Sequence, residues 1–280
     1  MKPGKTVQVF KAVFKLNWHL TTRYKGWFLF FVLFPIIFSA VPILLGRAVA
    51  GDPSKAAQSF QQYTGTSNYV VYMVVGSSLW VFAISSMWGF GMWLREQQMT
   101  GTLEQLLLTP VNPFLILLGE EIFNLLISTL QLSMALLFGS WIFGALGDLL
   151  SLRLAYSIGL LVLGIIPMYG LSMALGGLII RIKEAGSIIG ILQMLMGFLM
   201  GIFYPLTLLP GWVRILSILF PLTIVNNDVR AILLSTGFIF SLPADVLLLV
   251  LYMFIYPLIG FRVYEKVMIS LKKGEGVGGY

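Results

Sequence analysis

Long apolar runs separated by short polar segments dominate the chain. Each run predicted to cross a bilayer holds about 18 or more mostly apolar residues; these runs cover 27–46, 69–94, 114–146, 154–180, 188–209 and 244–262. They are too long and continuous for the roughly 10-residue alternating strands of a membrane barrel. The pattern predicts an all-α integral membrane protein with one transmembrane domain over residues 1–280.

The first polar stretch, residues 5–24, has a helical period. At about 100° per residue, Phe10, Val13 and Leu20 share one face, while Lys11 and Lys15 share the other. Such a pattern is typical of an amphipathic helix that lies in the membrane interface.

The region between the last two runs is apolar but interrupted. Pro205, Pro210 and Pro221 divide it, and Arg214 and Asp228 add charge. Its apolar pieces are too short to cross a bilayer. We expect short helices that dip into the outer face without crossing.

Composition and charge agree with this class. The chain is 58% hydrophobic and 10% charged, whereas soluble domains carry about 25% charged residues. With the N-terminus inside, 13 of the 18 Lys and Arg residues fall on inner segments. The positive-inside rule then predicts a cell-membrane protein with both termini in the cytoplasm. The net charge of +7 is explained by this topology and does not require nucleic acid.

The residue inventory argues against an enzyme. The chain has no Cys and one His, which excludes thiolate sites and leaves too few ligands for a metal site. Gly170–Met173 (GLSM) resembles the serine site of an intramembrane protease, but the only His, His19, lies on the predicted interfacial helix. The single Gly-Lys-Thr, Gly4–Thr6, lacks the first glycine of a P-loop.

The polar loop between the second and third runs has its own pattern. Thr102 and Gln105 have the spacing of a capping box, and Leu103, Leu106 and Leu107 share one helical face. About seven residues form no stable helix alone. The leucine face therefore needs a membrane surface or a groove on a partner protein.

This loop carries a family resemblance. GTLEQLLLTPV (Gly101–Val111), after Arg95–Glu96, resembles the signature loop of type-2 ABC exporter permeases, which transport drugs, lipids and polysaccharides. FYPLTLLPGWVRILSILFPLT (Phe203–Thr223) is similar to that family's stretch after the fifth span. With the layout of spans and the N-terminal helix, the resemblance covers nearly the whole chain.

The resemblance implies a coupling helix at 102–109 that docks into an ATPase subunit. The residues it places at or near this joint are Glu96, Gly101, Thr102, Leu103, Glu104, Leu106, Leu107, Thr109 and Pro110. It also implies a second cytoplasmic contact with the ATPase, made by Arg181, Lys183 and Glu184.

The function implied is that of a permease subunit, itself not catalytic, of an ATP-driven exporter of an amphiphilic drug, antibiotic or lipid. ATP and Mg would be bound by two partner ATPase subunits, and a second permease copy or a related permease would complete the complex. A polysaccharide or lipid-linked glycan exporter remains an alternative. An ATP-independent channel or membrane scaffold is a second alternative.

A last set of residues could line the transport path or a subunit interface. Glu120, Asn124 and Gln131 lie within about 40° on one face of their run, where interhelical hydrogen bonds are the preferred interpretation and a substrate path the alternative. The other candidates are Trp80, Trp88, Gln193, Gly197 and Gly201.

Overall fold

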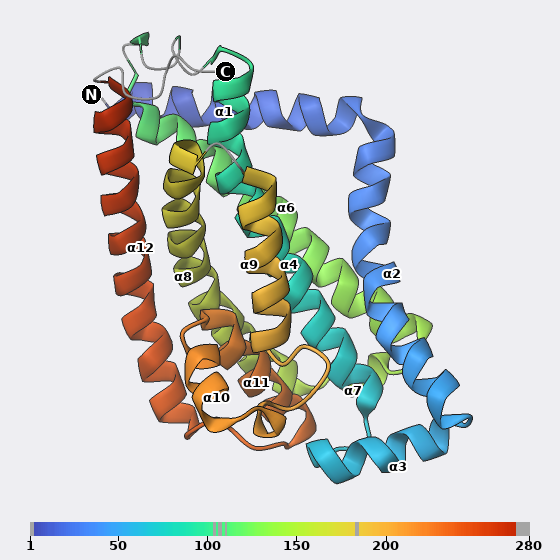
Figure 1. Cartoon of the computed structure of the whole chain (residues 1–280). Coiled ribbons are helices and arrows are strands. Elements are labelled where there is room, and N and C mark those ends of the chain that lie inside the picture. The colour runs from blue at the N-terminus through green and yellow to red at the C-terminus, as the bar shows by residue number, and fades with distance from the viewer. Residues whose placement is uncertain (1–2, 103–104, 106–107, 110, 183–184, 273–280) are drawn as a thin grey trace.

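A computed structural model describes residues 3–102, 105, 108–109, 111–182 and 185–272. All regular elements in these ranges are helical (Figure 1). They are α1 (Pro3–Arg23), α2 (Lys25–Ala50), α3 (Pro53–Thr64), α4 (Tyr69–Met99), α6 (Pro113–Ile142), α7 (Leu146–Leu149), α8 (Leu152–Ile182), α9 (Ala185–Leu199), the 3-10 helix η1 (Leu206–Leu208), α10 (Gly211–Ile218), α11 (Pro221–Leu234) and α12 (Leu242–Lys272). The predicted all-α membrane class is confirmed.

Four of these helices, α4, α6, α8 and α12, are long and apolar enough to cross a bilayer. Two bent pairs could raise the number within the described residues to 6: Ile36–Val49 with Pro53–Thr64, bent by 103°, and Gly211–Ile218 with Pro221–Leu234, bent by 101°. The apolar helix α9 has 15 residues, so its length of about 22 Å falls short of a hydrocarbon core of about 30 Å.

Helix α3 was not predicted. Residues 47–68 form a polar segment between the first two apolar runs of the sequence, and α3 occupies most of them. Asp52 caps this helix by accepting from Ser54 N at 3.0 Å, and Pro53 occupies its first turn. An N-cap Asp followed by Pro is a strong helix-start signal.

The helices define two ends of the molecule (Figure 1). The start of α1, the end of α12, the end of α4 and the start of α6 lie at one end, here called the terminal face. The helices α3, α10 and α11 lie at the other end, here called the distal face. Helix α1 runs across the terminal face, roughly perpendicular to α12.

Helix α4 is the centre of the bundle and packs against α2, α6, α8, α9 and α11. Helices α8 and α12 also pack closely: a Cβ at Gly170 would lie far inside van der Waals contact with the Pro257 backbone, and one at Gly260 would collide with Gly170 O. In the same stretch Ser172 is fully buried and donates to Met168 O at 3.0 Å. The GLSM residues therefore lie where two helix backbones touch.

Candidate functional site

The segment between α4 and α6 is the predicted docking loop. Helix α4 ends at Met99, and Gly101 follows with a φ of 70°. Of the predicted coupling helix, the described residues Thr102, Gln105 and Leu108 are helical. Leu103, Glu104, Leu106, Leu107 and Pro110 lie outside the described residues, and their docking role stays a prediction.

Thr102 fastens the start of this segment to α4. Its hydroxyl donates to the Gln97 side-chain Oε1 at 2.6 Å and lies 2.8 Å from the Thr100 hydroxyl. Thr102 is itself helical, and this bond runs back to α4. The start of the segment is therefore bonded to the last turn of α4, which includes the exposed Glu96.

Leu108 is the most exposed apolar side chain of the described part of this segment, at 85%. Leu108 was not among the predicted docking residues, because it lies off the helical face that the sequence predicts for Leu103, Leu106 and Leu107. The neighbouring Gln105 and Thr109 are also exposed. A single exposed leucine is common on protein surfaces, so Leu108 gains meaning only together with the predicted leucine face of its segment.

Three helices meet at Glu120, close to the docking segment. Asn17 of α1 donates to Glu120 Oε2 at 2.7 Å, and the indole of Trp93 on α4 lies beside the same carboxyl group. Glu120 is only 8% exposed. A carboxylate buried to this extent needs such donors, because an unpaired buried charge is strongly destabilising.

Apolar contacts reinforce this joint. Val13 and Phe10 of α1 pack where Gly119 of α6 has no side chain, with Val13 Cγ1 3.1 Å from the position of a Cβ. The rings of Phe14 and Phe123 meet edge to face at 5.4 Å. Helix α1 is therefore held against the first turns of α6, directly after the docking segment.

Replacing Asn17 by alanine should weaken the joint. The loss of a donor to a buried carboxylate is expected to cost about 1.5–3 kcal/mol, measured as a lower thermal midpoint of the detergent-solubilised protein. Thr22→Ala is the matched control, since Thr22 makes an exposed bond to Trp18 O within α1. Equal effects of the two substitutions would contradict the special role of the Glu120 contact.

Two other polar residues of α6, Asn124 and Gln131, face α4. Gln131 accepts from Ser85 at 2.6 Å, and Asn124 fills the space beside Gly89. These contacts are those expected of interhelical packing. A role of Glu120, Asn124 or Gln131 in a transport path stays a prediction.

Of the remaining path candidates, all but Trp88 lie on α9, against it or directly after it. Trp80 stacks on Phe38 of α2 with ring centroids 4.4 Å apart, and Gly197 lies against the Trp80 indole. Gly201 forms the turn after α9, with a φ of 60°. Gln193 is partly buried on α9, and Trp88 on α4 is exposed. The structure therefore brings Trp80 and Gly197 together and leaves Trp88 at the surface.

A buried arginine near the distal face was not predicted. Arg230 of α11 is 3% exposed and donates to Tyr72 O, Gly201 O and Ile202 O, with bonds of 2.9 Å to Tyr72 O and 2.7 Å to Gly201 O. Its guanidinium also lies 3.6 Å from the centroid of the Tyr72 ring. Gly76 makes this possible, because a Cβ there would overlap Arg230 Nη2 and Ile202 O.

This arginine cluster ties α11 to α4 and to the turn after α9. Asn226, one turn before Arg230, adds a bond to Met200 O at 2.9 Å. The Asn226–Arg230 spacing of four residues was the available signal in the sequence, since both then lie on one helix face.

The remaining predicted residues fall at helix ends. Pro205 precedes η1, Pro210 precedes α10, and Pro221 is the first residue of α11. Arg181 lies in the last turn of α8. Lys183 and Glu184 lie outside the described residues. Within the described ranges, no three His, Cys, Asp or Glu side chains gather as a metal site requires.

Comparison with known proteins identifies the family. No curated protein matches the chain. A family model described as "ABC-2 family transporter protein" matches residues 51–262, which is well over half of the 280 residues. The match includes the docking segment, the Arg230 cluster and most of the bundle. The chain belongs to the ABC-2 family of transporter proteins.

Proposed function

We propose that this ABC transporter permease is the membrane-spanning subunit of an ATP-driven exporter of an amphiphile. The observation that carries the proposal is the docking segment with its exposed Leu108, joined to α4 through Thr102. The segment presents an apolar side chain at the terminal face, where a partner ATPase would bind. In this proposal the terminal face lies in the cytoplasm and the spans lie in the cell membrane.

The proposed assembly has two permeases and two ATPase subunits. ATP and Mg would be bound by the ATPases. Helix α9 supports pairing of two permease copies, because Ile191, Met194 and Phe198 are exposed on it and Gly190 has open space around its Cβ position. Glycines of this kind allow close helix approach within a membrane.

The contacts at the terminal face suggest how ATPase motion would reach the spans. A shift of the docking segment would pull on α4 through the Thr102–Gln97 bond and on α1 through the Glu120–Asn17 bond. Helices α4 and α6 would then move together with α1. For net export, the substrate must bind the two resulting states with different affinities.

Purification tests the assembly. The full-length protein is extracted from its own membranes in mild detergent, and the co-purifying proteins are identified. A stoichiometric nucleotide-binding ATPase is the expected result, and a second, related permease would indicate a heterodimer. A chain that purifies alone, even after gentle crosslinking, would reject the docking role.

A further inference from the structure

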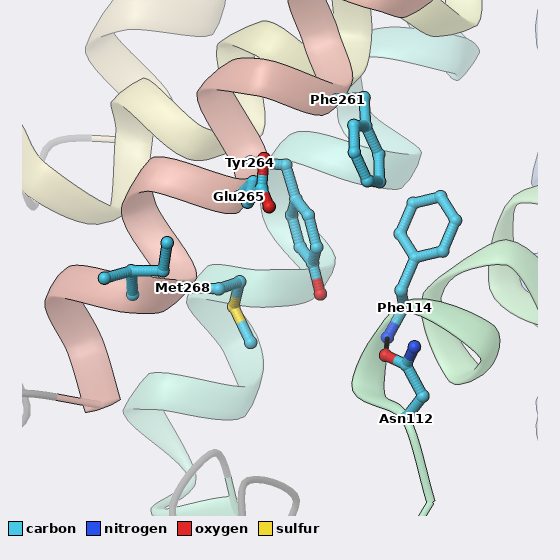
Figure 2. A pocket seen from close by; sticks show the side chains of 7 residues that line it. Asn112, Phe114, Phe261, Tyr264, Glu265 and Met268 are labelled. Carbon is cyan, nitrogen blue, oxygen red and sulfur yellow. Dashed lines mark hydrogen bonds between the residues drawn. The ribbon is translucent and has the colours of Figure 1, made fainter.

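A cavity of about 290 Å³ opens at the terminal face, between the start of α6 and the last turns of α12. Its lining includes Asn112, Phe114, Phe261, Tyr264, Glu265 and Met268 (Figure 2). Sites for drug-sized molecules begin at about 300 Å³. The cavity is therefore suited to the headgroup of a ligand rather than to a whole large molecule.

Aromatic rings form one side of this cavity. The Phe114 ring contacts Phe261 edge to face at 5.2 Å and lies 5.7 Å from the Tyr264 ring. Figure 2 shows the three rings converging from α6 and α12. Asn112 holds Phe114 in position by accepting from its backbone N at 3.0 Å. Faces of aromatic rings attract cations.

A carboxylate accompanies the rings. Glu265 is exposed at the cavity, and it has no ion pair within the described residues. The exposed Arg262 and Lys266 are near it in sequence, and within that part of the chain neither is paired with it. Aromatic faces next to a carboxylate are the chemistry that recognises an organic cation.

The cavity also continues an apolar stripe on α12. Phe254, Leu258 and Phe261 are exposed and precede Glu265 at spacings of four, three and four residues, which place all four on one helix face. Helix α12 has 31 residues and a length of about 45 Å, longer than a hydrocarbon core of about 30 Å. Glu265 therefore lies near the membrane surface, and the stripe lies deeper.

We propose that this cavity binds the cationic headgroup of an amphiphile whose alkyl chain lies along the α12 stripe. The ammonium group contacts Glu265 and the rings of Phe114, Phe261 and Tyr264. The ligand reaches the site laterally from the bilayer. Its role as the exported substrate rests on the proposed function above, whereas its binding requires no ATPase.

Binding is measured with the full chain in lipid nanodiscs without any ATPase. The probe is radiolabelled dodecyltrimethylammonium, and the methyl NMR signal of Met268, assigned with Met268→Leu, reports occupancy of the cavity. We expect saturable binding that shifts this signal. Glu265→Gln should weaken the affinity about tenfold, and Phe261→Leu should weaken it several-fold. Both residues are exposed, so the variants should fold.

Controls separate the possible sources of binding. Lys266→Gln, which removes a neighbouring positive charge, should leave the affinity within about twofold or tighten it. An uncharged dodecyl probe that binds equally well would overturn the role of the cation. If tetramethylammonium binds as tightly as the dodecyl probe, the inferred contribution of the alkyl chain is wrong. If Glu265→Gln binds dodecyltrimethylammonium with unchanged affinity, the cation site in this cavity is rejected. That conclusion holds even if the protein exports a substrate together with its ATPase.

Discussion

Replacing Gly76 by alanine is expected to destabilise the protein strongly, although the change adds only one methyl group to α4. The new Cβ would overlap both Arg230 Nη2 and Ile202 O. The arginine side chain could move, but the Ile202 carbonyl belongs to the backbone. Displacing Arg230 would also leave carbonyl groups of the turn after α9 without their donor.

The expected loss is about 3 kcal/mol or more, because overpacking costs about 1–3 kcal/mol and each orphaned buried acceptor a similar amount. A loss of this size should lower the midpoint of heat-induced aggregation by roughly 5–10 °C. The measurement is the fraction of monodisperse protein remaining after heating, followed by size-exclusion chromatography.

Gly159→Ala is the matched control, since Gly159 lies within α8 and a Cβ there has open space. It should be neutral or stabilising by up to about 1 kcal/mol, because alanine favours helix more than glycine does. Adding Arg230→Met to Gly76→Ala should recover only part of the loss, because the overlap with Ile202 O remains. If the Gly76→Ala variant is as stable as the Gly159→Ala variant, the close packing around Arg230 is contradicted.

Replacing Leu108 by aspartate is expected to leave insertion and folding intact while disrupting ATPase binding. The side chain is 85% exposed, so the folded permease loses little packing. In a complex the aspartate would be buried without a partner, which is costly. If Leu108 is an anchor of the interface, affinity should fall at least roughly thirtyfold. Leu107→Asp, chosen from the sequence pattern, should act in the same direction.

The measurement is the amount of ATPase that co-purifies with each variant at equal permease yield. Leu208→Asp is the control, because Leu208 is also exposed but lies in η1, beyond the distal end of α9. It should retain normal ATPase binding. Normal co-purification of both Leu108→Asp and Leu107→Asp would exclude the docking role of this segment.

The sequence predicted the helical membrane class because the length of an apolar run is a local property. Helices α4, α6, α8 and α12 follow the predicted runs, and each is long enough to cross the bilayer. Helix ends were less predictable. Residues 188–209 are apolar throughout, yet α9 ends at Leu199, and the turn at Gly201 follows.

The candidate site was predicted in part. The docking segment could be located because its helix period and terminating proline are local signals. The bond that joins it to α4 was not predicted: the spacing of Thr102 and Gln105 predicts a capping box, and the structure adds a bond from Thr102 to Gln97 of α4. The hydrogen-bond partners of a short polar side chain depend on which groups the folded chain brings next to it.

The contacts that join the helices were decided by tertiary structure alone. Asn17 and Glu120 are 103 positions apart, and Arg230 and Tyr72 are 158 apart. No period or motif in one segment indicates which distant backbone it will meet. By itself, the sequence determined that this protein is a helical bundle in a membrane, and it predicted a docking loop at one end. Only the packing of that bundle decided that Glu120 would join α1 to α6 and that Gly76 would make room for a buried arginine.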